Sequence, residues 1–165
     1  MSTTSAIREL PHFAAPRSSQ SSDEWYTPDT LVEALGSFDL DPATSLQRGR
    51  QLAPRFFTTE QDGLQAEWFG RVWLNPPYSD IRPWVKRMTE HNNGILLCFS
   101  RTEAVWFQEL IEHCGAVFCL RRRTQFRRPG GNKQACPMGT VLFPFGSDNV
   151  RRLKACSVPG LLLRL

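Results

Sequence analysis

A polar turn directly follows the apolar run Val72–Leu74, and its residues are Asn75, Pro76, Pro77 and Tyr78. Two consecutive prolines fix φ at about −65° and donate no N–H, so the backbone here cannot continue a strand or a helix. We therefore expect the side-chain oxygen of Asn75 and the carbonyl oxygen of Pro76 to accept hydrogen bonds from a planar amino group. The ring of Tyr78 would stack on the ring that carries this group. The alternative interpretation is a strand-ending turn with a packed tyrosine.

The chemistry that suits this turn is attack by the exocyclic NH2 of a base on a methyl donor. The lone pair of that nitrogen is delocalised into the ring and must be freed before it can attack. Two fixed acceptors facing the amino group achieve this by positioning and electrostatics, without a covalent intermediate.

Basic residues gather in the segment 121–133, which holds six Lys or Arg residues and no acidic one, while the net charge of the whole chain is +4. Acidic residues lie earlier, between Asp39 and Glu67. This split could place an acidic cofactor pocket beside a basic substrate face. We expect a loop at 121–137 with a mobile tip at Gly130–Gly131, because loops of this length are usually functional or disordered. A solvated basic loop is the alternative.

The 165 residues fit one domain, which we place at 23–165 behind a flexible Ser/Thr/Pro-rich tail at 1–22. No apolar run is long enough to span a membrane, and the N-terminus lacks a signal-peptide core, so we expect a cytoplasmic protein. Five Cys and three His show no metal-ligand spacing, so neither a metal nor a disulfide framework is expected. The oligomeric state stays open, a monomer included.

The elements that must position the turn alternate along the chain. Thr27 and Pro28 resemble a helix start, and Gly36 a helix end. After an ambiguous stretch, in which we expect one strand and a short helix at 63–68, strands and helices alternate. The expected strands are 38–41, 71–74, 95–99, 116–120 and 140–143, with at most a short strand at 161–165, and the expected helices are 80–91 and 103–113. This order predicts a doubly wound, mostly parallel α/β sheet with ligands beyond the carboxyl ends of its strands.

With these residues in place, the chain resembles the phage-type DNA N-6-adenine methyltransferases, which depend on S-adenosylmethionine. The resemblance spans about Trp25 to Phe145 and rests on the order of five segments: 25–28, 38–43, 57–64 with Trp68, 72–79, and 101–107. It implies a Rossmann-like fold with an antiparallel edge strand. It also implies a catalytic set of Asn75, Pro76, Pro77 and Tyr78.

The resemblance further implies a methyl-donor pocket lined by Trp25, Thr27, Pro28, Asp39, Asp41 and Asp62. A carboxylate suits the α-ammonium of the donor, and a hydroxyl beside a helix start suits its carboxylate. The expected cofactor is S-adenosylmethionine, with no metal. One departure is that no glycine follows the first strand, whereas methyltransferases of this fold usually carry a Gly-rich loop there.

The implied substrate is an adenine flipped out of double-stranded DNA, because its amine cannot be reached inside the stack. With no separate recognition domain in 165 residues, short loops must contact DNA. The candidates are Arg101, Arg121, Arg122, Arg123, Phe126, Arg127, Arg128 and Lys133. Pairing with Glu103 is the alternative role for Arg101.

Three other readings of the same turn remain open. It also suits RNA adenine or a protein glutamine side chain. A protein of a different class, a catalytically inactive nucleic-acid binder, would keep the fold and the basic loop but lose the donor. Binding of the donor distinguishes this last possibility from the enzymes.

Overall fold

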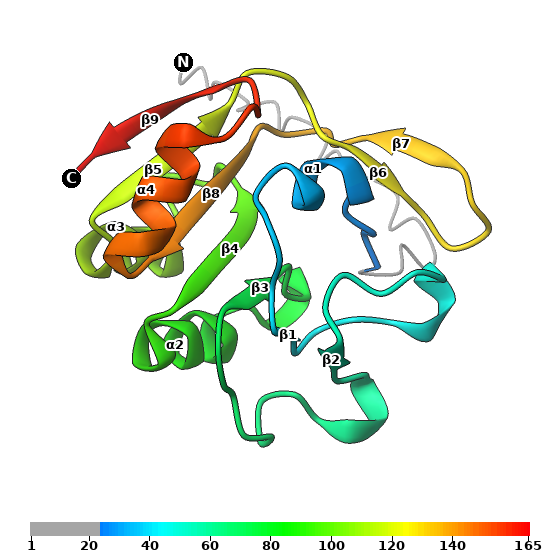
Figure 1. The fold of residues 1–165 in the computed structure, drawn as a ribbon. Coiled ribbons are helices and arrows are strands. Elements are labelled where there is room, and N and C mark those ends of the chain that lie inside the picture. The colour runs from blue at the N-terminus through cyan, green and yellow to red at the C-terminus, as the bar shows by residue number, and fades with distance from the viewer. Residues whose placement is uncertain (1–23) are drawn as a thin grey trace, which may run out of the picture.

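Seven strands form one mixed sheet in the computed structural model, which describes residues 24–165 (Figure 1). In sheet order the strands are β2 (Arg55–Phe56), β1 (Leu40–Asp41), β3 (Val72–Leu74), β4 (Gly94–Phe99), β8 (Thr140–Phe145), β5 (Ala116–Leu120) and β9 (Gly160–Arg164). The first four pair in parallel, β8 is antiparallel to both β4 and β5, and β9 is antiparallel to β5. Because β5 therefore points the same way as β4, most strands share one direction.

The mixed α/β architecture predicted from the sequence is confirmed, with one correction to the sheet. An antiparallel edge strand exists as β9, but a second antiparallel strand, β8, lies inside the sheet between β4 and β5. The chain between β5 and β8 contains no helix, so it returns to the sheet from the edge at which β5 ended. A strand that re-enters from that edge runs antiparallel to its neighbours, because a parallel strand needs a crossover connection.

Helices cover both faces of the sheet, as a doubly wound arrangement requires (Figure 1). On one face lie α2 (Arg82–His91) and α3 (Val105–His113), and on the other α1 (Asp29–Glu33) and α4 (Ser147–Ala155). Strand β4 is buried along its whole length, in agreement with its continuous apolar sequence. No helix in the described range is long and apolar enough to span a membrane.

The helices differ from the predicted ones in three places. Helix α1 begins at Asp29 with Pro28 in the N-cap position, so Thr27 does not cap it. The predicted helix at 63–68 is replaced by turns, after the short 3-10 helix η2 (Thr59–Gln61). Helix α4 was not predicted, because its polar sequence contains only two large apolar residues, Val150 and Leu153. The tail predicted at 1–22 lies outside the described residues.

The basic segment predicted as a loop at 121–137 contains a β-hairpin. Its strands β6 (Gln125–Arg127) and β7 (Lys133–Ala135) pair antiparallel. Gly130 and Gly131 lie at the tip with φ of 89° and 87°, values that glycine adopts without strain. The hairpin also pairs with the N-terminal segment, because Arg127 and Tyr26 exchange two backbone hydrogen bonds of 3.0 Å. Residues far apart in the sequence are thereby joined beside the sheet.

Candidate active site

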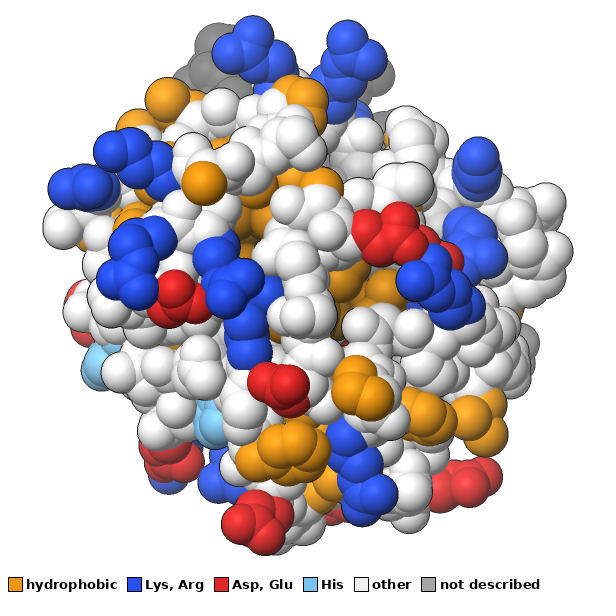
Figure 2. All heavy atoms as spheres, in the orientation of Figure 1, with side chains coloured by type: hydrophobic (Ala, Val, Ile, Leu, Met, Phe, Trp, Pro, Cys, Tyr) orange, Lys and Arg blue, Asp and Glu red, His pale blue; other side chains and the backbone are white. Residues whose placement is uncertain are grey.

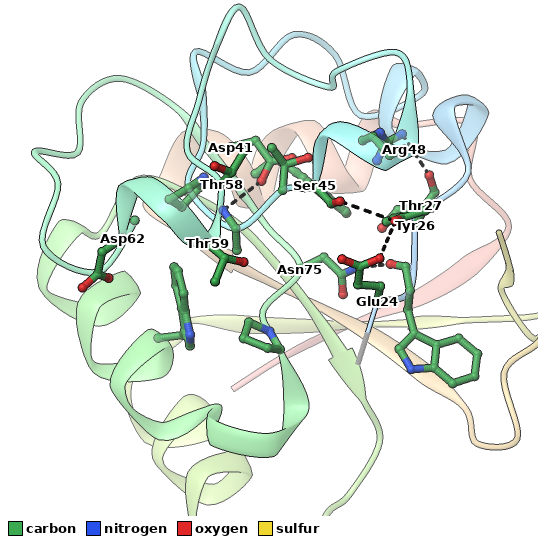
Figure 3. Close-up of a pocket in the computed structure, with 18 residues that line it drawn as sticks. Glu24, Tyr26, Thr27, Asp41, Ser45, Arg48, Thr58, Thr59, Asp62 and Asn75 are labelled. Atoms are coloured by element: carbon green, nitrogen blue, oxygen red, sulfur yellow. Dashed lines mark hydrogen bonds between the residues drawn. The ribbon is translucent and has the colours of Figure 1, made fainter. Parts of the chain in front are cut away.

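A cavity of about 290 Å³ opens where the parallel strands β1 and β3 end (Figure 3). Asp41 is the last residue of β1, and Asn75 directly follows β3. The cavity is lined by Glu24, Trp25, Tyr26, Thr27, Asp41, Pro42, Ala43, Thr44, Ser45, Arg48, Thr58, Thr59, Asp62, Gly63, Trp73, Asn75, Pro77 and Trp84. Its position agrees with the rule that ligands of such sheets lie beyond the carboxyl ends of the strands.

The structure brings together most of the residues predicted for the donor pocket. Trp25, Thr27, Asp41 and Asp62 all line the cavity. Figure 3 shows Asp62 near one end and the segment from Glu24 to Thr27 near the other. Residues 24–27 and several residues between 41 and 63 therefore line one cavity although they are separated along the chain.

Two predicted donor residues do not reach this cavity. Asp39 is exposed near the amino end of β1, where its Oδ2 accepts a hydrogen bond of 2.7 Å from the backbone N–H of Arg71. Pro28 precedes α1 and lines a separate hollow with Leu31. In the structure, Asp39 stabilises the chain just before β3, and Pro28 is the N-cap residue of α1.

Asp41 is a buried carboxylate, with only 3% of its surface exposed. Its Oδ1 accepts a hydrogen bond of 3.2 Å from the backbone N–H of Ala43. Burial raises the pKa of Asp41 to about 6, and the Ala43 N–H, Arg48 and the Thr44 hydroxyl oppose this rise. A carboxylate in this state gains stability from a cationic or hydrogen-bond-donating ligand. Among the described residues, no group of three His, Cys, Asp or Glu side chains could hold a metal ion.

The close approach that a Gly-rich loop usually permits is provided here from another part of the chain. Gly63 lies directly against Pro42, the residue after β1, and a Cβ at position 63 would lie 1.8 Å from the Pro42 carbonyl oxygen. Any side chain at position 63 would therefore push these two walls of the cavity apart. The expected position for such a glycine is immediately after the strand, and so Gly63 was not predicted.

Arg48 is a buried cavity residue that the sequence analysis did not identify. It ends the short 3-10 helix η1 (Leu46–Arg48) and is 5% exposed. Its Nη2 donates to the Thr27 carbonyl oxygen at 3.2 Å and forms an ion pair with Asp29. Burial lowers the pKa of Arg48, whereas Asp29 and Asp41 raise it. Nothing in its local sequence separates it from the exposed arginine two residues later, since only the tertiary fold brings it against residue 27.

Three buried polar atoms of the lining have no hydrogen-bond partner within the described chain: Thr27 Oγ1, Trp73 Nε1 and Asn75 Oδ1. Leaving such an atom unsatisfied costs about 1–3 kcal/mol. A ligand would remove this cost if it accepted a hydrogen bond from Trp73 Nε1 and made polar contacts with Thr27 Oγ1 and Asn75 Oδ1. The cavity is therefore suited to a polar ligand rather than to an apolar one.

The turn after β3 is divided between the cavity and its surroundings. Asn75 and Pro77 line the cavity, while Pro76 is buried and Tyr78 begins the short 3-10 helix η3 (Tyr78–Asp80). The Tyr78 ring stacks on Phe99, with centroids 3.8 Å apart and planes 5° apart. One face of Tyr78 is thus covered by the end of β4, so only its other face could stack on a ligand ring.

The hairpin packs against Trp25, which is one of the residues that line the cavity. Phe126 is fully buried and contacts the Trp25 ring edge-on at 5.6 Å, so the structure does not leave it accessible to DNA. The Arg128 guanidinium lies 4.1 Å from the Trp25 ring centre and donates to the Glu24 carbonyl oxygen at 3.0 Å. Arg127 is half-buried and lies 3.8 Å from Asp29. These three residues hold the N-terminal segment in place, and contact of Arg127 and Arg128 with DNA stays a prediction.

The remaining predicted DNA contacts are exposed: Arg101, Arg121, Arg122, Arg123 and Lys133. Arg101 pairs with Glu103 at 3.2 Å, and Arg123 donates to the carbonyl oxygens of Cys136 and Pro137. On the face seen in Figure 2, Lys and Arg side chains stand in several separate groups with acidic side chains among them. Arg121 follows β5, which ends at the same edge of the sheet as β3 and β4.

Fold and cavity together define an α/β protein with a cavity at the carboxyl ends of parallel strands, next to an Asn-Pro-Pro-Tyr turn. Residues 15–144 match the family described as DNA N-6-adenine-methyltransferase (Dam), and the chain belongs to this family.

Two phage proteins are similar to the chain. It is 33% identical over 109 residues to the DNA N-6-adenine-methyltransferase of Escherichia phage T1, covering 59% of this chain and 44% of that protein. It is 33% identical over 86 residues to the protein of the same name from Haemophilus phage HP1 (strain HP1c1), covering 48% of this chain and 49% of that protein. The chain thus spans about half the length of the curated relatives it matches. No solved structure matches it.

Proposed function

We propose that this protein transfers a methyl group from S-adenosylmethionine to N6 of adenine in double-stranded DNA, on a Rossmann-like fold. The observation that carries the proposal is the unpartnered Oδ1 of Asn75, which lies in the lining of a cavity that also contains the buried carboxylate of Asp41. Membership of the DNA N-6-adenine-methyltransferase family supports the same reaction.

The cavity residues fit the chemical groups of the methyl donor. S-adenosylmethionine, when bound, supplies an electrophilic methyl carbon on a sulfonium. We assign Asp41 to its α-ammonium, because a buried carboxylate is stabilised by a cation. We assign the unpartnered atoms Thr27 Oγ1 and Trp73 Nε1 to its carboxylate. Asp62, at the distant end of the cavity, is assigned to the adenosine part, and Trp25 forms part of the wall.

At the substrate side, Asn75 Oδ1 and the Pro76 carbonyl oxygen would accept the two protons of the adenine amine. Both acceptors are neutral and held by a rigid turn, so they draw the lone pair out of the ring without reorganising during the reaction. The face of the Tyr78 ring opposite Phe99 would stack on the adenine, while Phe99 supports the tyrosine from its other face. These residues act by positioning and electrostatics. Transfer would form the C–N bond as the methyl–sulfur bond breaks, leave S-adenosylhomocysteine, and release one proton from the methylated amine to solvent.

The target adenine must leave the DNA duplex to reach Asn75, because its amine is otherwise paired in the stack. We assign the phosphate contacts to Arg121, Arg122 and Lys133, which are exposed and form no side-chain ion pair with another residue of 24–165. Arg121 starts the segment that leaves the edge of the sheet at which β3 and Asn75 lie. Binding through phosphates predicts an affinity that falls steeply with salt.

The test is methylation with tritiated S-adenosylmethionine and unmethylated double-stranded DNA, followed by digestion and identification of the labelled nucleoside. We expect label in N6-methyladenine, and loss of label for Asn75→Ala, whose fold is checked by circular dichroism. Label in RNA or in glutamine instead of DNA would identify a different amine substrate. DNA binding without donor binding would show a nucleic-acid-binding relative that has lost catalysis, and would reject the proposal.

A further inference from the structure

The carboxamide of Asn75 has a defined orientation in the cavity wall. Its Nδ2 donates a hydrogen bond of 2.6 Å to the backbone carbonyl oxygen of Trp25. Its Oδ1 is buried and has no partner within residues 24–165. The reverse orientation would place two oxygens, both acceptors only, against each other. The Trp25 carbonyl therefore determines that the amide oxygen, and not the amide nitrogen, is left for a ligand.

The Trp25 carbonyl is itself held by contacts on both sides of it. The next residue, Tyr26, exchanges two backbone hydrogen bonds of 3.0 Å with Arg127 of the hairpin. The preceding carbonyl, that of Glu24, accepts from Arg128 at 3.0 Å. The Trp25 ring lies against the Arg128 guanidinium and the edge of Phe126. This acceptor cannot easily move away from residue 75.

We infer that the Trp25 carbonyl is a positioning group, which orients the amide oxygen of Asn75 toward the amine substrate and makes an un-ionised donor necessary at position 75. This inference rests on the proposed function for the identity of the substrate. It has a direct consequence for the substitution Asn75→Asp. An ionised aspartate has no proton to donate to the Trp25 carbonyl, whereas a protonated aspartic acid donates through its hydroxyl and keeps one oxygen for the amine.

The other charged and titratable groups around the cavity also disfavour an ionised side chain at position 75. From the N-terminal segment come Glu24 and Tyr26, from β1 Asp41, and from the end of η2 Asp62. Arg48 from η1 is the cation in the lining, and it is already engaged by Thr27 and Asp29. A carboxylate at position 75 would therefore face the Trp25 carbonyl oxygen in a cavity whose charged lining residues are mostly acidic.

The experiment compares wild type, Asn75→Asp and Asn75→Ala by kcat at saturating DNA and S-adenosylmethionine, between about pH 6 and about pH 8.5. The ratio of each variant to wild type removes any titration that the proteins share, such as that of Asp41. For Asn75→Asp we expect this ratio to rise about tenfold for each unit that the pH falls, because only the protonated acid fits. For Asn75→Ala, which has no proton to regain, we expect a low and flat ratio.

A flat ratio for Asn75→Asp, or one that rises with pH, would overturn the inference. Failure of the proposed function appears separately, as wild type that does not methylate DNA. In that case the inference is tested by the difference in thermal unfolding midpoint between wild type and Asn75→Asp, measured from about pH 4 to about pH 8. We expect the variant to lose stability relative to wild type as pH rises, because an ionised carboxylate at position 75 would face the Trp25 carbonyl oxygen without a proton to donate. A constant difference, or a variant unfolded at every pH, contradicts the inference.

Discussion

Asp41 and Asn75 both present an oxygen to the cavity, but their surroundings prepare them for different partners. Asp41 is buried, and its carboxyl pKa is raised to about 6, so near neutral pH it carries a charge that the protein itself only partly compensates. The amide oxygen of Asn75 is neutral and oriented by a backbone carbonyl. The charged carboxylate of Asp41 suits a cation. The neutral oxygen of Asn75 suits an amine, because it draws the nitrogen lone pair out of conjugation without taking a proton.

Replacing Asp41 with Asn is expected to stabilise the ligand-free protein at about pH 7.5 and to weaken the binding of S-adenosylmethionine. The folded-state pKa is raised from 3.8 to about 6, so the contribution of Asp41 to stability is present below about pH 3.8 and is lost as pH rises through about 6. The full shift corresponds to about 3 kcal/mol at about 1.4 kcal/mol per unit. Urea unfolding from about pH 4 to about pH 8 should show this loss in wild type and not in Asp41→Asn.

Donor affinity measured calorimetrically should change in the opposite sense. Wild type should bind S-adenosylmethionine more weakly as pH falls below about 6, since protonation removes the charge of Asp41. For Asp41→Asn we expect at least about a tenfold loss near neutral pH, or about 1.4 kcal/mol. Equal affinity of the two proteins at about pH 7.5 would remove Asp41 from the donor site.

At the scale of elements, the hairpin β6–β7 has a structural role as well as a basic composition. Its buried Phe126 packs against Trp25, while Arg127 and Arg128 form hydrogen bonds with the backbone of residues 24–26. Because residues 24–27 line the cavity, the hairpin supports one wall of the candidate active site. The exposed Lys133, at the start of β7, is therefore connected to that wall through the hairpin.

Phe126→Ala should lower the stability of the protein and also weaken binding of S-adenosylmethionine. Phe126 is fully buried, so its truncation should cost about 3–5 kcal/mol and leave Trp25 without its edge contact. Leu110→Ala, in α3 on the other face of the sheet, is a matched control with equal burial. If the two folded variants bind the donor equally well, the hairpin does not support the cavity.

The double substitution Arg121→Ala with Arg122→Ala should weaken binding to duplex DNA and reduce its dependence on salt. Each lost phosphate contact lowers the slope of log affinity against log salt by about 0.9. Arg123 is left in place, because it donates to the Cys136 and Pro137 carbonyl oxygens and its loss would disturb the hairpin. Arg151→Ala with Lys154→Ala on α4 is the control of equal charge. If the slope of log affinity against log salt is the same for both double variants, residues 121 and 122 are solvated surface residues that do not contact DNA.

At the scale of the whole molecule, the two edges of the sheet serve different purposes. The cavity lies at the carboxyl ends of β1 and β3, whereas the buried Arg71 precedes β3 at its amino end. Arg71 donates to Asn149 Oδ1 and to the carbonyl oxygens of Ser37 and Leu35, and its guanidinium lies 4.0 Å from the Phe38 ring centre. Arg71 thereby connects three parts of the fold by hydrogen bonds: helix α4, the end of α1, and the chain that leads into β1.

Arg71→Met should destabilise the protein by about 3 kcal/mol or more, because several buried acceptors lose their donor at once. The affinity of the folded protein for S-adenosylmethionine should remain unchanged, since Arg71 does not line the cavity. Urea unfolding and calorimetry, performed on the same preparation, measure the two quantities. A loss of affinity at full folding would show that the amino edge of the sheet also shapes the site.

The sequence by itself determined the elements whose residues carry a strong local pattern. The apolar run of β4, the stripe of α2 and the Asn-Pro-Pro-Tyr turn are each specified by neighbouring residues, and so they were predicted near their observed places. The cavity beside Asp41 and Asn75 also agrees with the expectation that ligands lie beyond the carboxyl ends of the strands. Helix α4 and the hairpin β6–β7 have weak or polar patterns and were missed.

Only the tertiary structure decided which polar residues meet. The roles of Arg48 and Gly63 depend on contacts with Thr27 and Pro42, which are 21 residues away in each case. The contact of the Asn75 amide with the Trp25 carbonyl spans 50 residues. Contacts at such separations depend on how the strands and the hairpin are ordered in space. Local residue preference does not contain this information, whereas a single backbone contact to residue 25 is enough to orient the amide in the cavity wall.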